Sequence, residues 1–137
     1  MMTALDTNIL SPVLSGAPTA ATIIAELLRA RFQGALVISG PVFVELAAIP
    51  GLDLERTEKA LKQSSIAVDF DIGEDIWRLA AGSFSAYAMR RRRSSGGSPK
   101  RLLTDFVIAA HALLRADRLM TLDPARYKLD FPTLHLV

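Results

Sequence analysis

Acidic side chains interrupt or end several apolar segments of the chain, where a charge is costly to bury. They are Asp6, Glu45, Asp105 and Asp123. If these carboxylates converge in the folded chain, repulsion and lost hydration would destabilise their charged forms unless a cation neutralises them. Ligands that are all oxygen suit a hard divalent ion such as Mg²⁺ or Mn²⁺. The pattern therefore indicates metal-assisted hydrolysis.

Three of the acids also have an ordinary structural explanation. Asp6 could cap the helix that follows it, Asp105 could favour the amino terminus of its own helix, and Asp123 could open a turn before Pro124. Glu45 is harder to explain, because it is the only charge in an otherwise apolar helical segment. Caps and turns explain the acids one at a time, but not their recurrence at one predicted edge of the fold.

Short β-rich runs alternate with longer helical patterns, which favours an α/β fold with a largely parallel sheet. The predicted strands cover 3–5, 36–39, 66–70, 119–122 and 133–136. The predicted helices cover 20–32, a short segment between 40 and 50, 53–64, 74–89 and 102–115. The segment 90–100, rich in Arg, Ser and Gly, is the one substantial predicted loop.

These elements predict where the acids lie. In an open parallel sheet, ligands bind beyond the carboxyl ends of the strands. Asp6 and Asp123 each follow a predicted strand, so they should face one crevice. Glu45, about two helical turns after the strand that ends at Ser39, and Asp105, in the first turn of its helix, should lie near the same edge if the crossovers are right-handed. The topology therefore predicts a single acidic site.

Composition narrows the class of protein. With 137 residues, half of them apolar and 22% charged, the chain is expected to form one globular domain over residues 1–137. The absence of cysteine excludes disulfides, thiolate metal sites and thiol catalysis. We find neither a secretory signal nor an apolar run of the ~20 residues that a membrane helix needs. We therefore expect a soluble, cytoplasmic protein without membrane association.

Basic residues cluster in one region, although the formal net charge is only +2. They are Arg90, Arg91, Arg92, Arg93, Lys100 and Arg101. Such a cluster can attract a phosphate backbone whatever its sequence, which predicts RNA binding. It can equally be a solvated loop whose charges only keep the chain in solution, and both interpretations stay open.

Several segments together resemble a known family, the PIN-domain ribonucleases, and most of all the VapC toxins of bacterial type II toxin–antitoxin pairs. They are Leu5 to Leu10, Ser39 to Leu46, Thr104 to Ala112, and Leu119 to Pro124. The resemblance spans nearly the whole chain in the expected order. It implies an α/β fold, a PIN-like three-layer sandwich in which a parallel sheet of about five strands is flanked by helices.

The resemblance also implies an activity and partners. The chain would be a metal-dependent endoribonuclease that hydrolyses RNA phosphodiester bonds at the acidic site, with Mg²⁺ or Mn²⁺ as cofactor. It would form a homodimer and bind a small VapB-like antitoxin whose carboxyl-terminal segment blocks the acidic pocket. His111 lies where many members carry a small or neutral residue, and we interpret it as a packing or surface histidine.

By position, the resemblance assigns a role to each site residue. The expected catalytic residues are Asp6, Glu45, Asp105 and Asp123. Asp6 and Asp105 would ligate the metal directly, and Glu45 would accept a proton from the attacking water. The supporting polar residues would be Asn8, Ser39 and Thr121.

Two other functions remain as alternatives. The first is an aspartate-based phosphotransfer domain, with Asp6 as the phosphoacceptor. The chain lacks, however, a second aspartate two residues later, as in haloacid-dehalogenase-type phosphatases, and a lysine after the last strands, as in receiver domains. The second is a PIN-like scaffold that binds RNA or a partner without cutting, which the presence of the complete acidic set disfavours.

Overall fold

The computed structural model describes residues 1–94 and 102–137. The strands in these ranges are β1 (Met2–Leu5), β2 (Ala35–Ser39), β3 (Ile66–Asp69) and β4 (Arg118–Met120). The helices there are α1 (Thr7–Ser15), α2 (Ala20–Gln33), α3 (Gly40–Ala47), α4 (Leu54–Gln63), α5 (Glu74–Arg93), α6 (Leu103–Arg115) and α7 (Ala125–Lys128).

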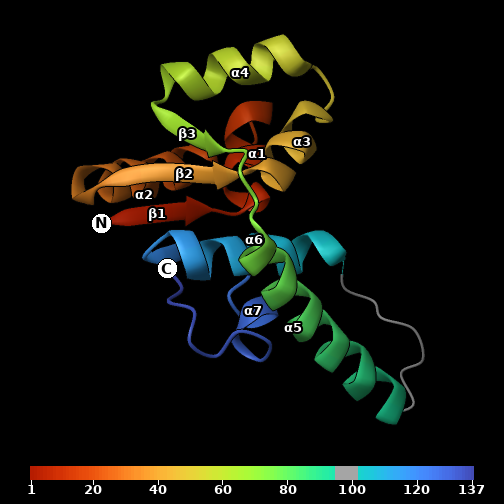
Figure 1. The fold of residues 1–137 in the computed structure, drawn as a ribbon. Coiled ribbons are helices and arrows are strands. Elements are labelled where there is room, and N and C mark those ends of the chain that lie inside the picture. The colour runs from red at the N-terminus through yellow and green to blue at the C-terminus, as the bar shows by residue number, and fades with distance from the viewer. Residues whose placement is uncertain (95–101) are drawn as a thin grey trace.

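The strands form one parallel sheet in the order β3-β2-β1-β4 (Figure 1). Each crossover between parallel strands contains a pair of helices, as the distance between the strand ends requires. The chain runs from β1 outward through β2 to β3 and then returns to place β4 on the other side of β1. The strand order therefore reverses between β1 and β4, and their carboxyl ends open at that switch point.

The predicted α/β class is confirmed, with one difference at the carboxyl end of the chain. The predicted strand at 133–136 is reduced to an isolated parallel bridge between Leu119 and Leu136. Backbone bonds on either side still hold this tail, since the amide of Leu119 donates to His135 and that of Val137 to Leu119. A turn in which Leu134 bonds back to Phe131 leaves too few residues for a longer strand.

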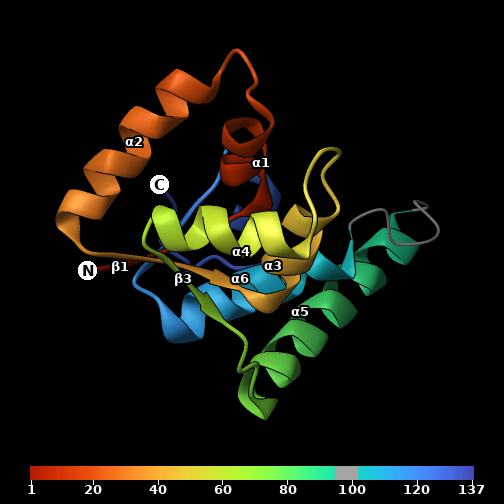
Figure 2. The ribbon, with the colours of Figure 1, turned by 90° about the horizontal axis from the view of Figure 1, so that it is seen from above.

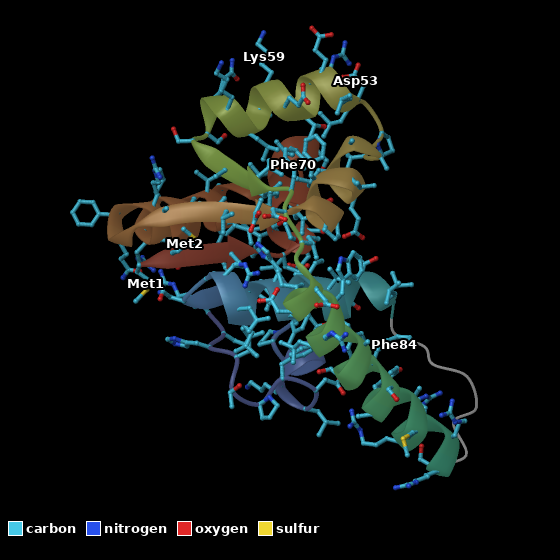
Figure 3. The ribbon with its side chains drawn as sticks, viewed as in Figure 1. Met1, Met2, Asp53, Lys59, Phe70 and Phe84 are labelled. Carbon is cyan, nitrogen blue, oxygen red and sulfur yellow. The ribbon has the colours of Figure 1, made fainter. Side chains whose placement is uncertain are left out.

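Helices cover both faces of the sheet. Figure 2 shows α2 and α5 on opposite sides of the strands. Helix α4 packs along β3 and is amphipathic, because Thr57 and Leu61 are buried while Asp53 and Lys59 point away from the strands (Figure 3). Asp53 caps this helix by accepting a hydrogen bond from the amide of Arg56. Among the described residues, no helix is both long and apolar enough to cross a bilayer.

Helix α6 has the longest run of buried residues among the described helices. Its residues from Asp105 to Ala112 are all buried, including three alanines with no exposed surface. Phe106 in this helix makes edge or tilted ring contacts with Phe84, Tyr87 and Phe131. Asp105, in the first turn, thus begins the stretch of the helix in which every residue is buried.

Helix α5 is longer than predicted, and the first residues of the predicted loop belong to it. The pattern predicted that helix structure ends at Met89, but α5 continues through Arg93. Arginine is a good helix former, and cations in the last turn interact favourably with the negative end of the helix dipole. Arg90, Arg91, Arg92 and Arg93 therefore lie on a helix, whereas the other basic residues of the cluster, Lys100 and Arg101, lie outside the described residues. Trp77, expected on the packing face or its edge, is 49% exposed.

Candidate functional site

Asp6 is the centre of the polar network at the carboxyl ends of β1 and β4. It follows β1 directly and caps α1, with Oδ1 accepting a 2.7 Å hydrogen bond from the amide of Thr7. Its other oxygen, Oδ2, accepts hydrogen bonds from the hydroxyls of Thr121 at 2.8 Å and Tyr127 at 2.7 Å. The residue is only 3% exposed. Three donors therefore hold a buried carboxylate in one orientation.

Glu45 reaches the same network from α3. Its Oε1 accepts a 2.7 Å hydrogen bond from the hydroxyl of Thr7, the residue whose amide binds Asp6. Thr7 thus joins two of the predicted acids, one through its backbone and the other through its side chain. The N-cap role that the sequence suggested for Asp6 is real, and it coexists with a place in the acidic cluster.

Arg126 joins the remaining two acids. Its Nη1 lies 3.4 Å from Oδ1 of Asp105, and its Nε lies 3.3 Å from Oδ2 of Asp123. Burial alone would lower the pKa of the Arg126 guanidinium, but the field of Asp105, Tyr127, Asp123 and Asp6 raises it above its ordinary value. The side chain is therefore a permanent cation among the carboxylates.

Asn8 and Thr121 organise the end of β4. The hydroxyl of Thr121 donates to Asp6 and accepts from Nδ2 of Asn8 at 3.3 Å and from the amide of Asp123 at 3.1 Å. Asn8 in turn accepts a 3.1 Å hydrogen bond from the amide of Leu122. One donated and two accepted bonds use the full capacity of the threonine hydroxyl. Both residues thus link Asp6 to the backbone that carries Asp123.

Tyr127 is buried without exposed surface beside Asp6. Burial first, and then the nearby charge of Asp6, raises the pKa of its phenol above the ordinary value. The phenol therefore stays protonated and acts as a hydrogen-bond donor to the carboxylate. Burial of the ring fixes α7 against the fold, and Arg126 precedes it by one residue.

The structure does not bring every predicted residue into this network. Ser39 ends β2 at the same edge of the sheet and is buried, but its hydroxyl forms no hydrogen bond within the described ranges. Arg90 forms an ion pair with Asp130, near the carboxyl end of the chain. His111 is 1% exposed and places Nε2 3.0 Å from Oδ2 of Asp69, at the end of β3. It is thus a buried histidine with a partner of its own, separate from the acids.

Three residues of the network were not predicted: Thr7, Arg126 and Tyr127. For the last two, a signal exists in the sequence. They lie three and four residues after Asp123, and on a helical turn that spacing places side chains beside one another. The hydrogen bond of Thr7 to Glu45 depends instead on the packing of α1 against α3, which no local pattern gives.

The donor chemistry of the network fits a hard divalent ion. All four acids offer carboxylate oxygens, Asp6 and Asp105 are the most buried of them, and Arg126 already supplies positive charge between Asp105 and Asp123. In the part of the chain that the structure describes, no three Asp, Glu or His side chains are gathered closely enough, as they stand, to coordinate one ion.

Comparisons with known proteins place this geometry in a family. Residues 3–132 match the family model of the PIN domain. VapBC2 from Rickettsia felis, solved bound to a DNA fragment from its promoter, contains a chain with a similar fold: TM-score 0.67 and 20% identity over 100% of this chain and 98% of that one. VapBC-1 from nontypeable Haemophilus influenzae gives 0.63 and 21%, covering 100% and 97%. No curated protein shows significant sequence similarity to the chain. Because the family match covers almost the whole sequence, the chain belongs to the PIN domain family.

Proposed function

We propose that the protein is a divalent-metal-dependent endoribonuclease and the toxin of a type II toxin–antitoxin pair. The observation that carries the proposal is the linked set of four acids at one edge of a PIN domain: Asp6 to Glu45 through Thr7, and Asp105 to Asp123 through Arg126. Thr121 connects the two halves, because it binds both Asp6 and the backbone of Asp123.

Each side chain has a part in phosphodiester hydrolysis. Asp6 and Asp105 would hold Mg²⁺ or Mn²⁺, which when bound lowers the pKa of a water and neutralises charge on the phosphate. Glu45 would accept the proton of the attacking water, with the hydroxyl of Thr7 fixing its orientation. Thr121 and Tyr127 would hold Asp6 in the ligating orientation, as residues behind metal ligands commonly do.

The arginines at the end of α5 are our candidates for RNA backbone contacts. Arg92 and Arg93 are exposed there, and a guanidinium binds a phosphate with two parallel hydrogen bonds. Lys100 and Arg101, which lie outside the described residues, belong to the same proposed set. These contacts would position RNA without selecting its sequence.

A small VapB-like antitoxin is the partner that we propose, together with a homodimer. Both similar structures are named as VapBC assemblies. An apolar groove of about 420 Å³ lies between α1, α2 and α4, and the exposed side chain of Leu28 in α2 lines it. Phe32, one turn further along α2, is also exposed. A hydrophobic segment of an antitoxin would cover this surface and from there could extend toward the acids.

The direct test is to incubate the purified protein with structured RNA in Mn²⁺ and to sequence the fragment ends. We expect cleavage at defined sites that a chelator stops. RNA that is bound but never cut, in any divalent ion, would favour the non-catalytic scaffold instead. Labelling of Asp6 by acetyl phosphate would favour phosphotransfer, although burial and three hydrogen-bond donors make this carboxylate a poor phosphoacceptor.

A further inference from the structure

We propose that Arg126 is an internal competitor of the metal: its guanidinium occupies Asp105 and Asp123 and must leave them for the divalent ion to bind tightly. This inference rests on the proposed metal site and adds what sets its affinity. Arg126 would then be a positioning residue, which keeps the acids together and tunes the metal concentration at which they are used.

The first support is the position of the guanidinium. It contacts one acid through Nη1 and the other through Nε, so that one cation bridges two carboxylates from α6 and from the turn after β4. The side chain of Asp105 is 12% exposed and that of Asp123 is 46% exposed. A divalent ion on Asp105 would lie close to the guanidinium, and the two positive charges would repel each other.

The second support is that the contact is loose. Charge-assisted hydrogen bonds between nitrogen and oxygen are usually about 2.7–2.9 Å long, whereas these contacts measure 3.4 and 3.3 Å. The Arg126 side chain is 38% exposed, so water reaches it. A partly solvated pair at this separation contributes little to stability, and a metal ion can displace it.

The third support is the local architecture of α7. The neighbouring Tyr127 is fully buried and anchors the helix through Asp6, so the backbone at 126 is fixed. The arginine side chain, in contrast, is 38% exposed where it contacts the acids. It can rotate away from the acids while α7, Tyr127 and the hydrogen bond to Asp6 stay in place.

The test measures Mn²⁺ binding without RNA, by calorimetry, in the whole protein and three variants. We expect Arg126→Gln to bind Mn²⁺ about tenfold more tightly than the natural protein, because a repelling charge is gone. Arg126→Lys should fall between them, since an ammonium cannot bridge both acids as a guanidinium does. Lys128→Gln is the matched control: Lys128 is exposed on the same helix and forms no ion pair in the described ranges.

Thermal unfolding gives a second readout. Without metal, Arg126→Gln should have a Tm only slightly below that of the natural protein, because the shared cation that two carboxylates lose is loosely bound and partly solvated. Saturating Mn²⁺ should raise its Tm by more than it raises that of the natural protein. If the glutamine variant does not fold, the same two measurements on Arg126→Lys decide the question.

The outcomes separate this inference from the proposed function. Unchanged or weaker Mn²⁺ binding in Arg126→Gln, with RNA cleavage intact in the natural protein, would overturn the competition and leave the nuclease proposal standing. An equal gain in Lys128→Gln would also overturn it, because net charge would then explain the effect. If the natural protein neither binds Mn²⁺ nor cuts RNA, both proposals fail.

Discussion

Buried polar groups lie at both ends of the β1–β4 strand pair, but their hydrogen-bond partners differ in charge. At the amino edge, where Met2 lies in Figure 3, Nε of Arg118 donates a 2.8 Å hydrogen bond to the hydroxyl of Thr3, and its Nη2 donates to Gln33. At the carboxyl edge, Thr121 instead donates to Asp6. These two hydrogen-bonded pairs, Thr3 with Arg118 and Asp6 with Thr121, are three residues apart along each chain segment, about 10 Å.

The two edges differ in their balance of positive and negative charge. At the amino edge, the guanidinium of Arg118 is satisfied by neutral oxygens of Thr3 and Gln33. The carboxylate of Asp117 is satisfied there by the amide of Met2. The carboxyl edge gathers four carboxylates and, among the described residues, the one guanidinium of Arg126, so negative charge is in excess in this network. A buried polar group is therefore not evidence of a site by itself, whereas an accumulation of like charge is.

We expect the largest effect on activity from substitutions of the acids at the carboxyl edge. Asp6→Asn or Asp105→Asn should reduce metal-dependent RNA cleavage on the order of a thousandfold, because a charged ligand to the ion is lost while the shape is kept. Circular dichroism and thermal unfolding check that each variant is folded. Full activity in a folded variant would refute the assignment of these acids.

A substitution at the amino edge should lower the stability of the fold and leave RNA cleavage unchanged. Arg118→Met leaves the buried hydroxyl of Thr3 without its donor, and we expect the free energy of unfolding to fall by about 1–3 kcal/mol. Urea unfolding measures that loss. Cleavage per folded molecule should not change, and a fall comparable to that of Asp6→Asn would mean that the two edges are not functionally distinct.

Tyr127→Phe tests whether the hydrogen bond from the phenol to Asp6 contributes to activity, and we expect a smaller effect. Asp6 loses one of its three donors but keeps the amide of Thr7 and the hydroxyl of Thr121. Losing a group that orients a ligand typically costs about tenfold or more in metal affinity or activity, so we expect a fall of about tenfold in kcat/KM. A variant with undiminished kcat/KM would leave the tyrosine with a packing role alone.

The same substitution should change the alkaline limit of folding. Because the pKa of Tyr127 is raised in the folded chain from 10.0, its contribution to stability is full below that pH. Above it the unfolded chain releases the proton and the folded chain retains it, so stability falls as pH rises. Urea unfolding at a series of alkaline pH values should show a shallower decline in Tyr127→Phe.

An exposed ion pair should matter least. Nη1 and Nη2 of Arg115 donate to the two oxygens of Asp75, and this hydrogen bonding lowers the pKa of Asp75 below 3.8. Its stabilisation is therefore present above pH 3.8 and is lost as pH falls through the lowered value. Asp75→Asn should lower the Tm slightly at neutral pH, and the difference should shrink below pH 3.8.

Much of the fold follows from local patterns in the sequence. Alternation of apolar runs and helical spacing predicted β1 to β4 and α2 to α6 to within a few residues. The predicted strand ends also placed Asp6 and Asp123 just beyond the carboxyl ends of two strands. The helix end at Arg93 was missed because four arginines resemble a solvated loop, although they suit the carboxyl end of a helix. The final strand shrank to one bridge because its length depends on a preceding turn.

The cross-connections of the site were not predictable in the same way. Asp6 and Thr121 are 115 residues apart in the chain, and Thr7 and Glu45 are 38 apart. Such contacts depend on the register of β1 against β4 and on the packing of α1 on α3, which no window of sequence contains. The residue pattern and the resemblance to a family both pointed to the acids. The spacing of Arg126 from Asp123 suggested a contact with that acid, but its contact with Asp105 is seen only in the folded chain.

The close packing of α6 has a consequence for how this protein tolerates mutation. Ala109 and Ala110 have no exposed surface, and they lie one turn along the helix from Asp105. A larger side chain at either position has no free volume to occupy, so the whole helix would shift and carry the carboxylate with it. The position of Asp105 thus depends on residues outside the proposed site, and we expect bulky replacements of these alanines to reduce the proposed activity by shifting α6 within the core.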